Sequence, residues 1–131
     1  MKFPVTISMA VLFVLTACAT PRELRQKVPD FDEVTNIPAE RMAGCVGDKL
    51  EANAGDPNTR YSTRPTTNGF SVEGVSNMGG IYSGSTDTPV LVDITRQNDG
   101  KTLIQLWSNY PFPAGTRNVV SLVKACLQPT L

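Results

Sequence analysis

The spacing of apolar residues predicts a helix near each end of the chain and strands between the two helices. In the first helical segment, apolar residues recur at positions i, i+3, i+4 and i+8: Met42, Cys45, Val46 and Leu50. A similar stripe near the C-terminus consists of Val119, Leu122, Val123, Cys126 and Leu127. Asn36 and Thr116 are the expected N-caps, because their side-chain oxygens can accept hydrogen bonds from the backbone N–H groups of a first turn.

A first hairpin is predicted where the apolar period changes to two. The pair Asn68-Gly69 separates the strand 60–65 from the strand 70–76, and such a pair is the strongest short-range hairpin signal. With these two residues in the turn, Arg64 faces Glu73 across the hairpin. We expect the two side chains to form a solvated cross-strand pair.

A second hairpin is predicted around the segment QNDG, which joins the strands 90–95 and 102–107. Alternation places one apolar group on one side of the sheet: Val90, Val92, Ile94, Leu103 and Trp107. The other side carries Leu91, Ile104 and Leu106. We expect this second group to form an exposed apolar strip, which commonly marks a partner surface. The alternative is that the N-terminal segment, the glycine-rich loop or a second copy of the chain covers it.

The aromatic segment YPFP, residues 110–113, is a further candidate for partner recognition. Two prolines would hold the rings of Tyr110 and Phe112 in a rigid loop. The alternative is that Phe112 covers the end of the core before the last helix.

Together these elements predict one α+β domain over residues 36–128. It consists of a helix, an antiparallel meander of three to four strands and a second helix, with both helices on one sheet face. Residues 129–131 form a short tail. Prolines and charges interrupt every apolar period in residues 18–35, so we expect this segment to be a flexible tether. A short helix over residues 22–27 is the alternative for part of it.

The N-terminus carries an export signal. Lys2 precedes an apolar segment that ends at Ala17 and is shorter than the ~20 residues of a membrane span. Leu15-Thr16-Ala17-Cys18 resembles the bacterial lipobox. The resemblance implies that residues 1–17 are removed and that Cys18 receives a diacylglycerol and an N-acyl chain. Ala19 stands where an Asp retains such proteins at the inner membrane, so the resemblance implies the periplasmic side of the outer membrane.

An ordinary signal peptidase offers an alternative, because Ala17-Cys18-Ala19 also fits a cleavage site with two small residues. Cleavage after Ala19 would leave a soluble periplasmic protein.

The two remaining cysteines lie on the apolar stripes of the two predicted helices. Because these helices should pack on the same sheet face in an oxidising compartment, we expect a disulfide between Cys45 and Cys126. Two buried free thiols, or a pair of metal ligands, are the alternatives. A metal site would need further thiol or imidazole ligands.

The composition argues against catalysis and nucleic-acid binding. The chain has 131 residues, with 12 Lys and Arg, 12 Asp and Glu, and no His. Without a basic surplus it is poorly suited to phosphate backbones. The absence of His removes the commonest general base and metal ligand, and a nucleophilic Ser71 or Ser83 would need Lys101 or Lys124 beside it. We therefore expect no enzymatic activity, no cofactor, no metal and no small-molecule substrate.

Four segments of the chain carry a family resemblance: ERMAGCVGDKLE, RPTTNGFSV, VLVDI and LVKAC. They are similar to a group of small proteobacterial lipoproteins that carry one cysteine in each of two helices. The resemblance implies the lipid anchor, the disulfide and the helix–sheet–helix fold, and it supplies no activity.

The sequence thus predicts a non-enzymatic lipoprotein of the outer membrane. It would be attached through its lipid and would have a structural role or bind a protein partner, including a second copy of itself. One alternative is a small inhibitor, for example of lysozyme, or a phage-type exclusion lipoprotein. Another is an accessory lipoprotein of a secretion system.

Overall fold

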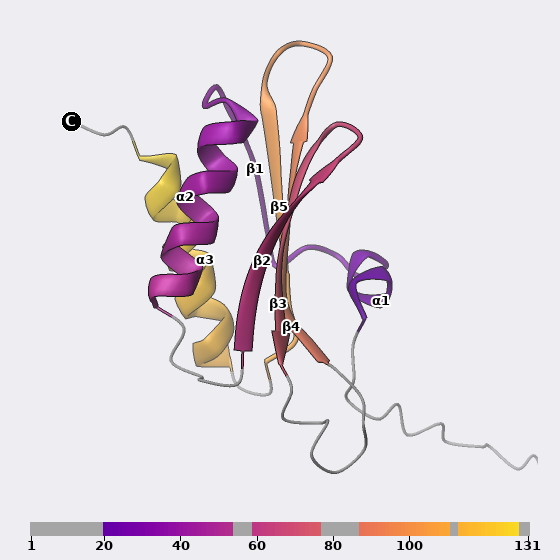
Figure 1. Cartoon of the computed structure of the whole chain (residues 1–131), viewed down its shortest axis with the longest axis vertical. Coiled ribbons are helices and arrows are strands. Elements are labelled where there is room, and N and C mark those ends of the chain that lie inside the picture. Colours follow the sequence, from indigo (N-terminus) through magenta and orange to yellow (C-terminus); the bar gives the residue numbers. More distant parts are fainter. Residues whose placement is uncertain (1–19, 54–58, 77–86, 111–112, 129–131) are drawn as a thin grey trace, which may run out of the picture.

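A computed structural model of the chain describes residues 20–53, 59–76, 87–110 and 113–128. Within these ranges the chain forms a five-stranded antiparallel sheet and three helices (Figure 1). The elements follow one another as α1 (Pro21–Arg25), β1 (Phe31–Thr35), α2 (Ala39–Ala52), β2 (Thr59–Thr66), β3 (Gly69–Ser76), β4 (Asp87–Arg96), β5 (Thr102–Ser108) and α3 (Pro113–Leu127). This mostly β fold contradicts the predicted three to four strands with a helix at each end.

The additional strand and helix come from residues 20–35, which the sequence predicts as a tether. β1 pairs with β5, from Phe31 opposite Leu106 to Thr35 opposite Thr102. As an edge strand, β1 pairs with another strand along only one of its two long edges. The middle of β1 is exposed to solvent, so the strand needs few apolar residues. The polar sequence of β1 therefore lacks the apolar alternation by which a strand is predicted. The tether prediction is wrong for residues 20–35.

The sheet order is β1-β5-β4-β3-β2. Strands β2 to β5 form a meander in which each strand pairs with the next along the chain. β1, the first strand in the sequence, completes the sheet beside the last one. Both edges of the sheet are thus formed by strands from the first half of the chain.

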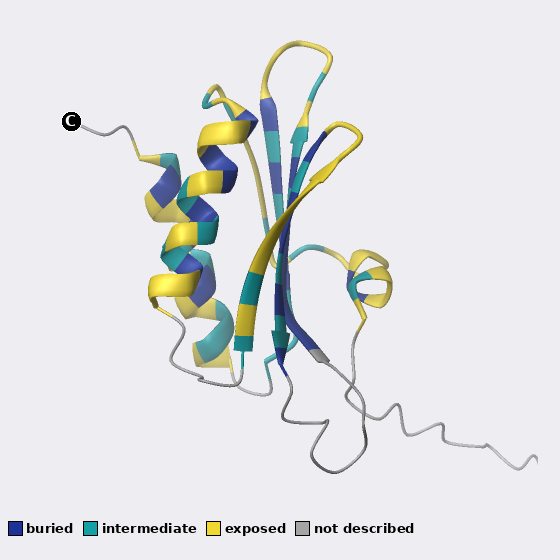
Figure 2. Ribbon diagram, viewed as in Figure 1, coloured by how far each residue is buried: buried dark blue, intermediate teal, exposed yellow. Residues whose placement is uncertain are grey.

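The two longer helices, α2 and α3, lie side by side on one face of the sheet, and α1 lies on the other face (Figure 1). The main core fills the space between the sheet and the two longer helices (Figure 2). Its fully buried large side chains are Met42, Val46, Leu50, Val72, Val90, Val92, Ile94, Ile104, Leu106 and Val123. Burying each such side chain is worth about 1.5–3 kcal/mol, so this layer supplies most of the stabilisation.

The register of β4 with β5 corrects the predicted faces of the second hairpin. Val92 lies opposite Leu106, and Ile94 lies opposite Ile104. Because directly opposed residues point to the same side, Ile104 and Leu106 face the longer helices. The predicted grouping is wrong in β5, since a shift of one residue exchanges the two faces of a strand.

The first hairpin turns one residue earlier than the sequence predicts. Thr66 pairs with Gly69, so Gly69 belongs to β3 and Arg64 lies opposite Ser71. Arg64 nevertheless reaches its diagonal neighbour Glu73, with Nη2 2.7 Å from Oε2. Glycine is required at position 69 because a Cβ there would lie 1.9 Å from the carbonyl oxygen of Ile94.

Candidate functional site

The sheet face opposite the longer helices receives the N-terminal segment. Thr20 caps α1, with its Oγ1 accepting a hydrogen bond from the backbone N–H of Glu23 at 3.3 Å. The short helix places Leu24 against Leu91 and Trp107, and these three buried residues form a second, smaller hydrophobic cluster. Burial of a leucine side chain is worth about 2 kcal/mol, so Leu24 is the apolar anchor of the segment.

Beside Leu24, an ion pair fastens α1 to the sheet. The guanidinium of Arg25 donates from Nε to Oδ2 of Asp93 at 2.7 Å and from Nη2 to Oδ1 at 2.9 Å. The same Nη2 donates to the hydroxyl of Ser71 at 3.2 Å. The hydrogen bonds to Asp93 raise the pKa of Arg25, while partial burial opposes this rise.

Hydrogen bonds between side chains and the backbone hold the rest of the segment on the sheet. The indole N–H of Trp107 donates to the carbonyl oxygen of Lys27 at 2.9 Å. The carboxylate of Asp30 accepts from the backbone N–H of Ser108 at 2.7 Å and from its hydroxyl at 3.1 Å. We call the contact of Leu24, Arg25 and Lys27 with Leu91, Asp93 and Trp107 the α1 docking site.

The α1 docking site holds the N-terminal segment against the sheet and engages the hydroxyl of Ser71. Ser71, one candidate nucleophile, is only 2% exposed, and its hydroxyl is engaged by Arg25, a cation that cannot act as a base. Lys124 lies on α3, behind the opposite sheet face, with Nζ 5.8 Å from the ring centre of Phe31. Ser83, the other candidate, lies outside the described residues.

The predicted apolar strip is not a surface. Leu91, Ile104 and Leu106 are each 0% exposed. Ile104 and Leu106 belong to the main core, because the register turns them toward the longer helices. Leu91 does face the other side, where Leu24 and Trp107 cover it. The proposal of a partner surface at these residues is therefore wrong, and for Leu91 the cover is the N-terminal segment.

The aromatic loop is described only in part. Tyr110 is half-buried and packs against the main core. Gly115 lies beside it, so close that a Cβ there would be 2.8 Å from Cγ of Tyr110. Phe112 lies outside the described residues, as do Cys18 and the rest of residues 1–19, so the recognition loop and the lipidation site stay predictions.

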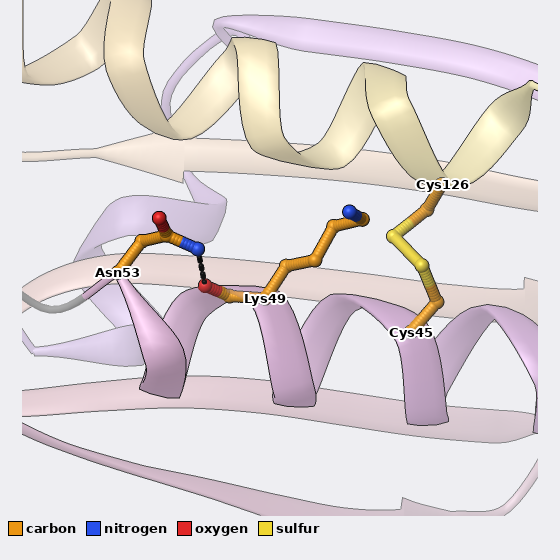
Figure 3. Close-up of a disulfide and its surroundings, with 4 residues drawn as sticks. All are labelled: Cys45, Lys49, Asn53 and Cys126. Atoms are coloured by element: carbon orange, nitrogen blue, oxygen red, sulfur yellow. Dashed lines mark hydrogen bonds between the residues drawn. A yellow bond between two sulfur atoms is a disulfide. The ribbon is translucent and has the colours of Figure 1, made fainter.

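The expected pairing of Cys45 with Cys126 is present in the structure. The disulfide joins the middle of α2 to the end of α3, and the two Cα atoms lie 5.8 Å apart (Figure 3). At the C-cap of α2, the Asn53 side chain donates to the carbonyl of Lys49 at 2.8 Å and closes the end of the helix (Figure 3). The disulfide therefore ties the two halves of the helical layer to each other.

Two shallow hollows lie at the edges of the helical layer. One, of about 180 Å³, separates α2 from β2 and is lined by Ala43, Gly44, Gly47, Asp48, Glu51, Tyr61 and Thr63. The other, of about 460 Å³, borders α3 and is lined by Asp30, Thr116, Arg117, Val120, Ser121 and Lys124. In the second, Asp30 and Thr116 already form hydrogen bonds with Ser108, which leaves Arg117, Ser121 and Lys124 as the other polar side chains of its lining.

Nothing in the described ranges gathers three or more His, Cys, Asp or Glu side chains that could hold a metal ion. In the same ranges, no helix is both long enough and apolar enough to cross a membrane. No protein-family model matches the chain, and no curated protein matches it.

Proposed function

We propose that the chain is a lipid-anchored, non-enzymatic domain of the bacterial envelope, attached through Cys18 to the periplasmic side of the outer membrane. Its role is structural or is to bind a protein partner. The cysteines carry this proposal. The disulfide joins Cys45 to Cys126, so Cys18 is the one cysteine of the chain outside this bond. Cys18 is the last residue of the lipobox-like segment.

The disulfide supports an oxidising compartment. Structural disulfides persist in the periplasm and outside cells, whereas the cytosol keeps thiols reduced. The bond lies in the helical layer, away from the α1 docking site, so it serves the fold of the domain. An exported protein with a structural disulfide and a lipobox cysteine is best explained as an envelope lipoprotein.

The available side chains favour a role without catalysis. The chain has no His, and the polar groups of the α1 docking site are engaged with one another. Stable anchoring by two or more acyl chains would keep the domain at a membrane surface. A domain of this kind acts by its position and its surface.

Lipidation is tested by expressing the chain in a Gram-negative host with radiolabelled palmitate and determining the intact mass of the purified protein. We expect label in the protein, a mass that corresponds to an acylated Cys18, and recovery in the outer-membrane fraction. Cys18→Ala should lose the label and the membrane attachment while keeping the fold. An unacylated protein beginning at Thr20 would instead establish cleavage after Ala19 and a soluble periplasmic protein.

The disulfide provides an independent arm of the same experiment. Alkylation in denaturant without reductant should label neither Cys45 nor Cys126, whereas alkylation in denaturant after reduction should label both. A protein whose two thiols react without reductant would contradict the proposed oxidising compartment even if Cys18 proved to be acylated.

A further inference from the structure

The most exposed large hydrophobic side chain in the described part of the protein lies close in sequence to the proposed anchor. Val28 is 88% exposed, and the next large hydrophobic residue in exposure is Val34, at 45%. Both belong to the N-terminal segment, and Val28 is ten residues after Cys18. Single exposed apolar residues are common, so the position of Val28 relative to the anchor is what matters.

Val28 and Val34 lie on the α1 side of the sheet. Val34 is opposite Leu103, and alternation along β5 places Leu103 on the same face as Trp107. Val28 directly follows Lys27, whose carbonyl is bound by Trp107 on that face. Val34 therefore lies on the α1 side of the sheet, opposite the helical layer. Val28 lies in the segment that joins α1 to β1, next to the carbonyl that Trp107 binds on that side.

The chain between Cys18 and the folded domain is very short. The N-cap of α1 is Thr20, two residues after Cys18. Two residues span at most about 7 Å. Because α1 is fastened to the sheet through Leu24 and Arg25, a lipid on Cys18 would hold the α1 side of the domain close to the bilayer.

We propose that the α1 side of the domain rests on the phospholipid headgroups, with Val28 inserted among them and Arg22 and Lys27 against the phosphates. This orientation rests on the lipid anchor proposed above. It replaces the expected tether, which would have held the domain off the membrane.

The α1 side carries both basic and acidic groups, and two of its basic side chains are available to lipid phosphates. Arg22 and Lys27 are exposed and form no ion pair within the described residues. The carboxylates of Asp93 and Glu73 face the same side, and each is paired with an arginine. Glu23 on α1 and Asp32, which lies opposite Gln105, are also exposed on this side and form no ion pair within the described residues. The ion pairs of Asp93 and Glu73 reduce the repulsion that unpaired acidic groups would feel near phosphates.

The single tryptophan of the chain reports on this orientation. Trp107 lies in the α1 docking site and is 5% exposed. The acylated protein is reconstituted into vesicles of phosphatidylethanolamine and phosphatidylglycerol that contain a dansyl-labelled lipid. We expect efficient energy transfer from Trp107 to the labelled headgroups.

Two altered proteins serve as matched controls. The first carries Trp107→Phe and Ala125→Trp, which moves the donor to an exposed position on α3, on the opposite side of the sheet. The second carries a Gly/Ser linker of about 20 residues after Ala19, whose root-mean-square length is about 25 Å. We expect both proteins to lose most of the transfer, with circular dichroism unchanged.

Val28→Asp tests the contact itself. The variant should stay acylated and membrane-bound and should show reduced transfer from Trp107, because the insertion of Val28 is lost.

Transfer equal from Trp107 and from the tryptophan on α3 in acylated protein would overturn the orientation alone. Unacylated protein would overturn the anchor together with the orientation. A dimer in detergent that Val28→Asp dissociates would overturn the membrane contact in favour of a second copy of the chain.

Discussion

Arg25 and Asp93 lie 68 residues apart in the sequence and form a two-bond ion pair on the face of the sheet that the longer helices leave uncovered. The pair turns a segment with the composition of a linker into part of the domain. Planar guanidinium groups suit such bidentate contacts with carboxylates. The pair therefore offers a direct measure of how strongly α1 is docked.

Arg25→Ala should lower the free energy of unfolding by about 1 kcal/mol, a value discounted for solvent screening because the arginine side chain is 39% exposed. Urea unfolding measures it, and Trp107 emission should shift to longer wavelength as α1 loosens. Arg64→Ala is the matched control, since its side chain is 62% exposed, and it should cost less than about 0.5 kcal/mol. Equal losses in the two variants would contradict a special role for Arg25.

Replacing both disulfide cysteines should destabilise the helical layer. Cys45→Ala with Cys126→Ala opens a loop that spans 81 residues, and we expect a loss of about 2–4 kcal/mol, below the chain-entropy ceiling of about 4.5 kcal/mol. Urea unfolding of oxidised wild type, reduced wild type and the double variant checks this. Reduced wild type should match the double variant, and an unchanged midpoint in both would show that the bond does not constrain the unfolded chain.

Two glycines should respond in opposite directions to alanine. Gly69→Ala places a Cβ 1.9 Å from the carbonyl oxygen of Ile94 and should cost about 3 kcal/mol or more, since backbone must move. Gly44→Ala has nothing within 4 Å of the new Cβ and should stabilise α2 by about 0.5–1 kcal/mol. Thermal unfolding of the two variants measures both effects. A Gly69→Ala protein as stable as wild type would contradict the close approach of β3 to β4.

Glu40 should make stability depend on acid pH. The hydrogen bond from Arg96 lowers the pKa of Glu40 below its ordinary value of 4.5. A lowered folded-state pKa means that the carboxylate stabilises the fold above pH 4.5, and that this contribution is lost as the pH falls through the folded value. Glu40→Gln should therefore have a lower melting temperature than wild type at pH 7, and the difference should shrink below pH 4.5.

Arg96→Gln is the control for that pH dependence. In this background the partner of Glu40 is absent and the backbone hydrogen bond still lowers its pKa, so the effect of Glu40→Gln should depend on pH less than it does in wild type. A difference that persists unchanged at low pH in the wild-type background would show that Glu40 does not act through Arg96.

Much of the helical layer could be predicted because its apolar residues recur at regular spacing. The stripe of α2 and the stripe of α3 indicate their buried sides, and the disulfide follows from one cysteine on each stripe. The segment QNDG likewise marks its turn, where Gly100 has a φ of 83°, a backbone conformation that favours glycine.

The helix α1 and the strand β1 could not be predicted by spacing because each of these two elements contributes too few apolar residues. Leu24 is the buried residue of a five-residue helix, and β1 has exposed residues through its middle. The usable signals were local: Thr20 followed by Pro21 suits a helix start. They indicate a short helix without indicating what it packs against.

The predicted partner strip failed for a different reason, the register of one hairpin. The loop between β4 and β5 places Arg96 opposite Thr102. A loop one residue longer or shorter would turn each side chain of β5 to the other face of the sheet. Sequence alternation shows that Ile104 and Leu106 share a side, but it does not show which side. Only the pairing with Val92 and Ile94 decides that.

The position of β1 beside β5 has a consequence for how the protein is made. Chains are synthesised from the N-terminus, so β1 leaves the ribosome early. It cannot pair until residues 102–106 have also been synthesised. Arg25 waits for Asp93 in the same way, and Cys45 waits for Cys126. A chain that stops short of its last helix keeps Cys45 as a free thiol. Oxidation of that thiol into the native bond thus marks a chain that has been completed.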